Sequence, residues 1–276
     1  MPTKTVVIGR NSLIARVLRR HPETADWRFL AHREALADPS WAQGASCVVN
    51  CAYDARLKSR PYDAAYDIDL PLAASAAAAA APYVMLSSRL AYGLAGRDGR
   101  LAEDMPPAPT TRYGRAKRET EARLRAVPGL ALTVLRLANI FDPLEAEGER
   151  VSFFGLAMRG LRREGRITFD MSPFVARDFL PAEVLAERLV MVAAAPRLGL
   201  FNMGSGFALP CGRVAEWLIE GHGGGTLLVV DCRDHDGFWL DMTATARAWR
   251  FRPFGPAELR LHCVAAGRSL RREGCG

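Results

Sequence analysis

Short apolar runs of strand type alternate with helical segments over the first two thirds of the chain. Strands are expected at 5–8, 27–31, 47–52, 83–87 and 131–135, and helices at 13–20, 62–81 and 113–126. Strands that are separated by helices of this length pair in parallel, because the helix carries the chain back to the edge where the previous strand began. The alternation therefore predicts an α/β fold of the Rossmann type, a doubly wound parallel sheet.

After Asp142-Pro143 the pattern becomes less regular. Helices are expected at 151–163 and 181–195, and extended segments at 167–169 and 200–203. A chain of 276 residues can hold a nucleotide-binding domain and a smaller companion. We expect a Rossmann domain over 1–150 that also takes in 176–205, and a smaller C-terminal substrate-binding lobe made of 151–175 and 206–276.

The composition, with 49% hydrophobic and 24% charged residues, is that of an ordinary globular protein. The net charge of +7 comes from arginine. Because aromatic residues are not interleaved with these arginines in a stripe, we expect anionic small molecules as partners in preference to nucleic acid. The six cysteines show no CxxC spacing, and no metal site is expected. The alanine-rich run between Pro71 and Pro82 is too short for a bilayer, which predicts a cytoplasmic protein without a membrane partner.

The turn after the first strand is the first candidate for cofactor binding. A dinucleotide site places small residues there, so that the backbone approaches the pyrophosphate at a helix N-terminus. Only one of the three usual glycines, Gly9, is present, with Ser12 and Ala15 as small substitutes. The alternative is an ordinary turn that is capped by a polar side chain. The candidate cofactor contacts in this turn are Gly9, Arg10, Asn11, Ser12, Leu13 and Ile14.

The end of the second strand bears on the choice of cofactor. An acid at this point would bind the ribose hydroxyls and favour NAD. The strand is followed by His32 and Arg33, and the first acid is Glu34. Arg10 and Arg33 would suit a 2′-phosphate, because guanidinium forms paired hydrogen bonds with phosphate oxygens. The sequence therefore favours NADP(H), with NAD(H) as the alternative and with His32 as a further contact; both arginines could instead face solvent.

Tyr113 and Lys117 are four residues apart on an expected helix and so share one face. A free phenol has a pKa of about 10, and a nearby ammonium group lowers it. Tyr113 could then exchange a proton with a carbonyl or alcohol while a nicotinamide exchanges hydride. Ser88 follows a parallel strand at the edge where ligands bind, and it could hold the reacting oxygen. The alternatives are a surface Tyr–Lys pair and a turn serine.

Several ordered motifs resemble those of one enzyme family. The segment SSRLAYG at 87–93 resembles SSxxVYG, and YGRAK at 113–117 matches YxxxK. Further on, LRLANIFDP at 135–143 is similar to LRxxNVYGP, RDFLPAEVLA at 177–186 to RDxxHVxDLA, and FNMGSG at 201–206 to YNxGxG. Together they resemble the extended short-chain dehydrogenase/reductase family of the NAD-dependent epimerase/dehydratase type, which acts largely on nucleotide sugars.

The resemblance implies roles for individual residues. Ser88, Tyr113 and Lys117 would be catalytic, and Tyr113 and Lys117 would also contact the cofactor. Asn139 would contact the phosphates of a nucleotide sugar, and Arg177 would pair with its diphosphate. Pairing of two copies through the Tyr–Lys helix is common in the family, so a homodimer is also expected.

The departures from the family pattern narrow the expected activity. Cys51-Ala52 stands where the family has a cofactor-lining HLAA-type segment, so both residues are expected to contact the cofactor. Ser88 is followed by Arg89-Leu90 in place of the Asp-Glu pair that 4,6-dehydratases need, which argues against a dehydratase and places Arg89 beside the substrate.

The expected activity is an NADPH-dependent reduction of a keto group on a nucleotide-linked sugar, with Tyr113 as the proton donor. Two alternatives stay open. The first is a nucleotide-sugar epimerase that retains NAD and returns the hydride to the same substrate. The second is a non-catalytic NAD(P)-binding regulatory protein on the same fold.

Overall fold

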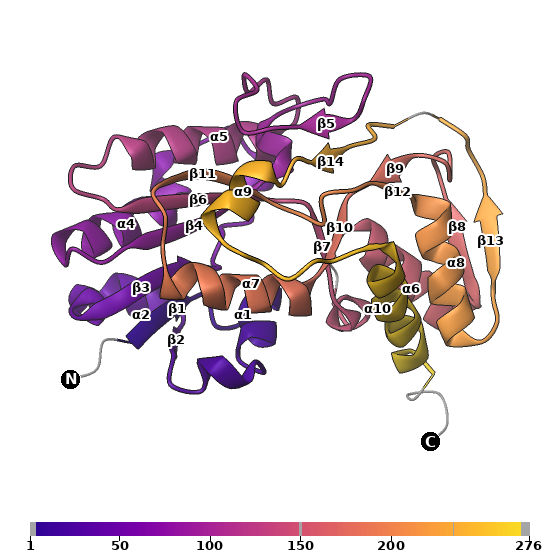
Figure 1. The fold of residues 1–276 in the computed structure, drawn as a ribbon, viewed down its shortest axis with the longest axis horizontal. Helices are drawn as coiled ribbons and strands as arrows, with labels where there is room; N and C mark the ends of the chain where they lie inside the picture. The colour runs from indigo at the N-terminus through magenta and orange to yellow at the C-terminus, as the bar shows by residue number, and fades with distance from the viewer. Residues whose placement is uncertain (1–3, 149–150, 234, 272–276) are drawn as a thin grey trace.

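A computed structural model describes residues 4–148, 151–233 and 235–271. Its centre is a sheet of six parallel strands in the order β11-β6-β4-β3-β1-β2 (Figure 1). These strands are β1 (Lys4–Ile8), β2 (Arg28–Leu30), β3 (Ala45–Asn50), β4 (Tyr83–Ser88), β6 (Leu132–Leu137) and β11 (Gly199–Met203). The parallel, doubly wound sheet that the sequence predicts is confirmed.

Helices cover both faces of the sheet. One face carries α2 (His32–Ala37), α4 (Asp69–Ala78) and α5 (Arg112–Arg125), and the other carries α1 (Leu13–Leu18) and α7 (Ala182–Ala194). Successive side chains along a strand point to opposite faces of the sheet, so each strand contributes to the apolar core on both faces. On β4, for example, Tyr83 packs in the core beneath α4, whereas its neighbour Val84 packs in the core beneath α7.

The strand order reverses at β1, because β2 lies on one side of it and β3 on the other. In open α/β sheets, ligands bind outside the carboxyl ends of the strands at such a reversal. Gly9 follows β1 and Cys51 follows β3, so these two residues meet at this point.

A second apolar core lies beyond the end of the sheet, to the right in Figure 1. It is built from α6 (Phe153–Glu164), α8 (Cys211–His222), α10 (Pro256–Ser269), β8 (Arg166–Phe169) and β13 (Thr226–Val229). Within it, Met158, Leu218 and Cys263 are fully buried.

Two late elements return to the sheet. β14 (Trp239–Leu240) pairs with β5 (Arg100–Leu101), and α9 (Thr243–Ala248) lies against β11. The division into two domains stays a prediction, and its boundary residues 149–150 lie outside the described part of the chain.

α3 (Arg56–Ser59) follows β3 and contacts α5. The remaining short strands are β7 (Asn139–Phe141), β9 (Ala176–Arg177), β10 (Phe179–Pro181) and β12 (Leu209–Pro210). β7 pairs in parallel with β10, and β9 pairs with β12 in the antiparallel sense.

The expected helix at 62–81 differs most from the structure. α4 begins only at Asp69, and a single 3₁₀ turn at Ala64–Tyr66 precedes it. Pro71 explains the late start, since proline lacks an N–H and is tolerated only in the first turn of a helix. The other expected bounds differ by a few residues, because end caps decide them: α6 starts at Phe153, where the Gly155 N–H donates to Ser152 Oγ over 3.0 Å.

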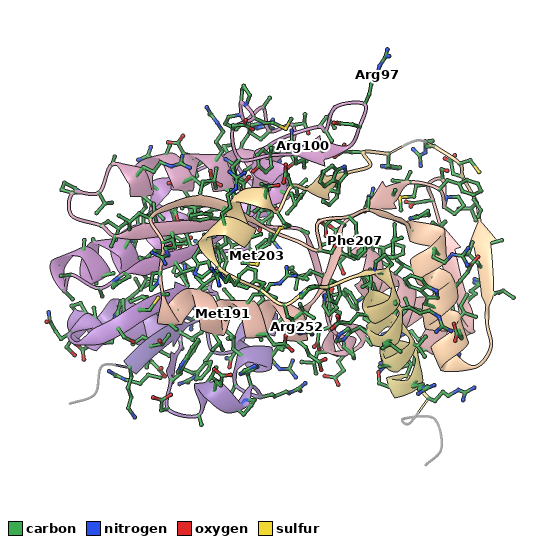
Figure 2. The ribbon with its side chains drawn as sticks, viewed as in Figure 1. Arg97, Arg100, Met191, Met203, Phe207 and Arg252 are labelled. Carbon is green, nitrogen blue, oxygen red and sulfur yellow. The ribbon has the colours of Figure 1, made fainter. Side chains whose placement is uncertain are left out.

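Much of the basic charge lies on the outside. Arg97 points away from the body of the protein, and Arg252 lies in an exposed group of ion pairs with Glu187 and Glu258 (Figure 2). None of the described helices combines the length and the apolar composition that crossing a membrane requires.

A buried ion pair joins α5 to the sheet. Arg136 on β6 donates from Nη2 to Glu121 Oε2 over 2.7 Å and from Nε to Oε1 over 3.0 Å. Ser87 at the end of β4 donates to Glu121 Oε1 over 2.5 Å. Neither Glu121 nor Arg136 exposes more than 2% of its surface, so the pair has little access to water.

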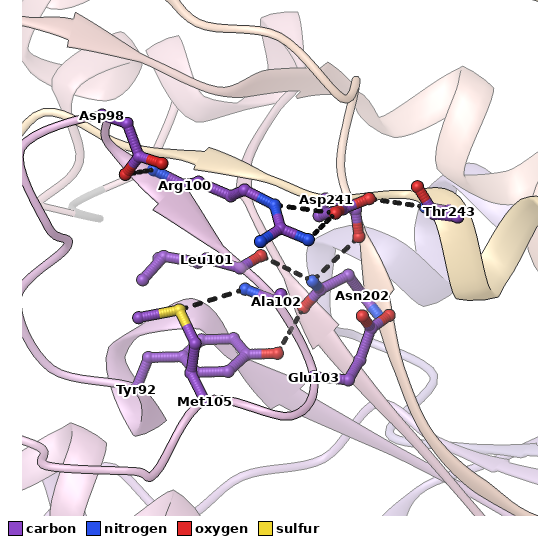
Figure 3. Close-up of polar contacts among 10 residues, drawn as sticks. All are labelled: Tyr92, Asp98, Arg100, Leu101, Ala102, Glu103, Met105, Asn202, Asp241 and Thr243. Atoms are coloured by element: carbon purple, nitrogen blue, oxygen red, sulfur yellow. Dashed lines mark hydrogen bonds and ion pairs between the residues drawn. The ribbon is translucent and has the colours of Figure 1, made fainter.

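The pair extends through an aromatic ring to a second polar group. The Arg136 guanidinium lies 4.1 Å from the centre of the Tyr92 ring, and the Tyr92 hydroxyl donates to Asn202 Oδ1 over 2.7 Å. Asn202 Nδ2 donates in turn to the carbonyl oxygens of Leu101 and Asp241 (Figure 3). The network ties α5, β4, β6 and β11 together at the carboxyl edge of the sheet.

We predict that Arg136→Met lowers the free energy of unfolding by about 3–5 kcal/mol, because it removes the two short bonds to the buried Glu121 carboxylate and leaves only a longer ion-pair contact of 3.6 Å with Arg125. Chemical denaturation monitored by circular dichroism measures the change. The double variant Glu121→Gln, Arg136→Met removes the stranded charge and should recover part of the loss. The control is Arg213→Gln, which breaks an exposed pair with Glu216 and should cost about 0–1 kcal/mol. A loss for Arg136→Met no larger than that of the control would contradict the prediction.

Candidate active site

A cleft of about 630 Å³ opens at the carboxyl ends of β3, β4 and β6. Most of the side chains that the sequence nominates for chemistry and substrate binding line it. The predicted residues that line the cleft are Ile14, Cys51, Ala52, Ser88, Arg89, Tyr113, Lys117, Asn139 and Arg177. The fold thus brings together residues from β4, α5, β7 and β9 that are far apart in the sequence.

The start of α5 places Tyr113 next to Ser88. Thr111 caps the helix, since its Oγ1 accepts the Gly114 N–H over 3.0 Å. Gly114 packs so tightly that an added Cβ would lie 2.1 Å from the Leu90 carbonyl oxygen. The Leu90 N–H donates to Ser88 Oγ over 3.2 Å. The helix turn that carries Tyr113 therefore rests directly on the turn that follows Ser88.

Lys117 lies one turn further along α5 and is only 3% exposed. Its Nζ donates to the Leu86 carbonyl oxygen over 2.9 Å, which fixes the ammonium group near the end of β4. The same Nζ lies 4.5 Å from the centre of the Tyr53 ring. No other hydrogen bond of this ammonium group is seen among residues 4–148, 151–233 and 235–271, so two of its three N–H donors remain for a ligand or for water.

Tyr53 is a cleft residue that the sequence analysis did not nominate. Its ring stands perpendicular to that of Tyr113, with 5.1 Å between the ring centres. Its hydroxyl is buried and makes no hydrogen bond with any of the described residues. Burial, and after it the neighbouring Tyr113, raises the pKa of Tyr53, so this phenol stays protonated and can donate. The feature of the sequence that could have nominated Tyr53 is its position directly after Cys51-Ala52, which were expected to contact the cofactor.

After the Tyr53 hydroxyl, the side-chain amide of Asn139 is the second unpaired polar group in the cleft. Its Nδ2 is buried and has no hydrogen-bond partner within the described part of the chain. Buried polar groups are nearly always paired, and such a group in a native structure calls for a ligand or water. Two unpaired groups, Tyr53 Oη and Asn139 Nδ2, in one cleft fit a polar ligand such as a dinucleotide or a sugar phosphate.

The turn after β1 borders this cleft. Gly9 has a φ of +94°, and an added Cβ would lie 2.6 Å from the Ala52 backbone nitrogen, so no other residue fits there. Ser12 caps α1 by accepting the Ala15 N–H over 3.2 Å. Burial raises the pKa of the Cys51 thiol to about 12, which keeps it neutral. Of the predicted cofactor contacts, Gly9, Arg10, Asn11, Ser12 and Leu13 lie in this turn and its first helical residue but do not line the cleft itself.

The first turn of α2 carries Glu34, the first acid after β2, to which the sequence assigned no role. Glu34 folds back so that its Oε2 accepts the Ala31 N–H over 3.0 Å, and its Oε1 lies 2.9 Å from Arg10 Nη1. The predicted contacts His32 and Arg33 open α2 beside it, and Arg33 is exposed. Arg10 is therefore already paired with a carboxylate, and this makes it a weaker candidate for binding a 2′-phosphate.

A parallel sheet whose carboxyl edge holds a serine, a tyrosine and a lysine around one cleft is the architecture of NAD(P)-dependent enzymes of the extended short-chain dehydrogenase/reductase type. The model of the NAD dependent epimerase/dehydratase family matches residues 8–204, and the chain belongs to this family. It is an NAD(P)-dependent enzyme, and the non-catalytic alternative is set aside.

Several solved structures share this fold. A UDP-N-acetylglucosamine 4-epimerase from Methanobrevibacter ruminantium, in complex with UDP-N-acetylmuramic acid, aligns with a TM-score of 0.84 at 16% identity over 98% of this chain and 99% of its own. A UDP-glucuronic acid 4-epimerase from Bacillus cereus, with UDP-glucuronic acid and NAD, gives 0.78 at 14% over 98% and 100%. RMD from Pseudomonas aeruginosa, complexed with NADPH, gives 0.77 at 16% over 97% and 99%. No curated protein matches the sequence.

We predict that Gly114→Ala impairs the site although alanine favours a helix by about 1 kcal/mol. The methyl group would overlap the Leu90 carbonyl, and overpacking of this kind costs about 1–3 kcal/mol. The expected result is a lower melting temperature and a turnover reduced by at least about tenfold, since a small displacement of Tyr113 is costly. Gly255→Ala is the control, because nothing lies within 4 Å of its added Cβ. Unchanged turnover in Gly114→Ala would refute the close packing.

Proposed function

We propose that the protein moves hydride to and from one ring carbon of a nucleotide-linked sugar, with Ser88, Tyr113 and Lys117 as its catalytic residues. The observation that carries the proposal is the meeting of these three side chains in one cleft with two unpaired polar groups. The chemistry needs one proton carrier beside one reacting oxygen, and the cleft offers Tyr113 for this role.

Each residue has a definite task in this proposal. Tyr113 Oη takes the proton of the sugar hydroxyl as the carbon is oxidised, and it returns the proton when the carbonyl is reduced. Ser88 Oγ donates a hydrogen bond to the same oxygen and holds it in place. Lys117 keeps one N–H on the Leu86 carbonyl and offers the others to the cofactor ribose. A bound nicotinamide supplies and accepts the hydride.

The diphosphate of the substrate would lie against Arg177 and Asn139. Arg177 Nε is held by the Asp236 carbonyl oxygen at 3.3 Å, and this leaves guanidinium N–H groups for phosphate oxygens. The unpaired Nδ2 of Asn139 is a matching donor.

We place epimerisation first among the possible outcomes of this chemistry. An epimerase needs only the proton carrier and a retained cofactor, and two of the similar structures are 4-epimerases. Elimination of water would need a further acid and base, and no Asp or Glu is among the described residues that line the cleft. The keto reductase that the sequence favours is the second candidate, because the turn after β1 keeps only Gly9 of the usual glycines and would release its cofactor more easily.

We further propose that NAD(H) is the preferred cofactor, in contrast to the preference that the sequence favours. The Glu34 carboxylate beside Arg10 suits the ribose hydroxyls and would repel a 2′-phosphate. The expected homodimer stays a prediction.

We predict that Tyr113→Phe lowers turnover of nucleotide sugars by about 10²–10⁴-fold, because it removes the proton carrier. Product analysis by NMR measures the rate, and cofactor absorbance at 340 nm shows whether reduced cofactor is consumed. An epimerase gives product without net consumption, whereas a reductase consumes one cofactor per product. Tyr66→Phe, outside the cleft lining, is the control. Turnover that survives in Tyr113→Phe would rule out the assigned chemistry.

We predict that Glu34→Gln weakens NAD⁺ binding by about tenfold and leaves NADP⁺ binding equal or stronger, because the carboxylate favours the ribose diol and opposes the 2′-phosphate. Fluorescence titration of both cofactors measures the two dissociation constants. Glu216→Gln, on the exposed face of α8, is the control. A loss of NADP⁺ binding in Glu34→Gln would show that the carboxylate does not discriminate as proposed.

A further inference from the structure

The charge of the cleft is one-sided. Four cationic side chains line it, Lys58, Arg89, Lys117 and Arg177, and the described lining contains no carboxylate. A cleft with low-dielectric walls and charges of one sign concentrates ligands of the opposite sign. Lys117 and Arg177 have tasks in the proposed function, whereas Arg89 has none there, although it follows Ser88 directly.

Arg89 is held in a defined position. Its side chain is 13% exposed, and its guanidinium carbon lies 4.0 Å from the centre of the Phe238 ring. Its Nη1 donates to the Asp236 carboxylate, and that carboxylate also accepts the Ala95 N–H over 3.2 Å. Stacking on a ring and pairing with a carboxylate leave little freedom, so the group is preorganised rather than a loose surface arginine.

The Arg89 guanidinium has N–H groups beyond the one that binds Asp236. Arg89 lines the cleft and Asp236 does not, so the carboxylate partner of Arg89 lies outside the cleft lining. Within the described residues, the bond from Nη1 to Asp236 is the one side-chain hydrogen bond of Arg89. The remaining N–H groups of the planar guanidinium are therefore available for hydrogen bonds with an anion.

Arg89 and Arg177 converge on the same residue. Arg89 binds the side chain of Asp236, and Arg177 Nε binds its backbone carbonyl. In the proposed function, Arg177 takes the diphosphate, which is attached at C1 of the sugar. On a pyranose ring, C1 and C5 flank the ring oxygen, so a substituent on C5 lies next to the anomeric phosphate. Two neighbouring guanidinium groups match two anionic groups arranged in this way.

We propose that the sugar of the substrate carries a carboxylate at C5, as in a nucleotide-linked uronic acid, and that Arg89 binds this carboxylate. The inference rests on the proposed function, since it takes Ser88 and Tyr113 to hold the reacting oxygen of the same sugar. Arg89 is then a specificity residue, which selects acidic over neutral sugars by a charge-assisted, bidentate contact.

Titration calorimetry in the presence of saturating NAD⁺ tests this with two matched pairs of ligands, UDP-glucuronate against UDP-glucose and GDP-mannuronate against GDP-mannose. In the wild-type protein, the acidic member of the pair that binds should bind about 10–100-fold more tightly than the neutral one. In Arg89→Gln this ratio should fall to within about threefold of unity. Arg89→Lys keeps the charge without the fork and should give an intermediate ratio.

The ratio of the two affinities is taken within each variant, so a partly unfolded preparation does not distort it. If Arg89→Gln fails to fold, Arg89→Lys still tests the proposal. Arg213→Gln, on the exposed face of α8, removes the same charge outside the cleft and should leave the ratio unchanged.

The outcomes separate the two proposals. Equal affinity for acidic and neutral members in the wild-type protein, or a ratio that survives in Arg89→Gln, overturns the role of Arg89 and leaves the proposed function standing. Weakening of both members to the same extent in Arg89→Gln shows that Arg89 binds the diphosphate, and it also overturns the inference. No binding of either pair overturns the proposed function itself.

Discussion

The buried pair of Glu121 and Arg136 is the constraint on which the geometry of the cleft depends. α5 carries Tyr113 and Lys117, whereas Ser88 ends β4, so the site requires that the helix be held at one position along the sheet. The carboxylate of Glu121 receives hydrogen bonds from both β6 and β4, which sets the position of the helix along the sheet. Burial makes a misaligned pair costly, so the interaction specifies one arrangement more than it adds stability.

A second buried carboxylate performs a similar task at the other side of the cleft. Asp178 follows Arg177 and accepts N–H groups of Ser205, Gly206 and Leu240. These donors come from the turn after β11 and from β14, and the bonds hold β10 to both segments. Burial raises the pKa of Asp178, and the hydrogen bonds from Ser205 oppose this rise. The two ends of the cleft are thus positioned by polar groups that water does not reach.

The sequence was sufficient for the fold and for much of the cleft lining because these follow from local signals. The alternation of strands and helices predicts the parallel sheet, and a spacing of four residues puts Tyr113 and Lys117 on one helix face. The roles of Tyr53 and Glu34 could not be predicted, because they depend on contacts that no periodicity records. Tyr53 meets the Tyr113 ring, and the Glu34 side chain accepts the Ala31 N–H. Asp236 is 147 residues from Arg89 in sequence, and only the path of the C-terminal segment brings the two together. The alanine run favours a longer helix than α4, whose start is set by Pro71.

The bond from Lys117 Nζ to the Leu86 carbonyl has a consequence for how fast and how tightly a ligand is taken up. A free lysine side chain samples many rotamers, and immobilising it costs about 1.5–2 kcal/mol in conformational entropy. Here that loss occurs when the chain folds, so an arriving ribose meets an amine that already points in one direction. The free energy of cofactor binding is therefore not reduced by the cost of ordering the lysine.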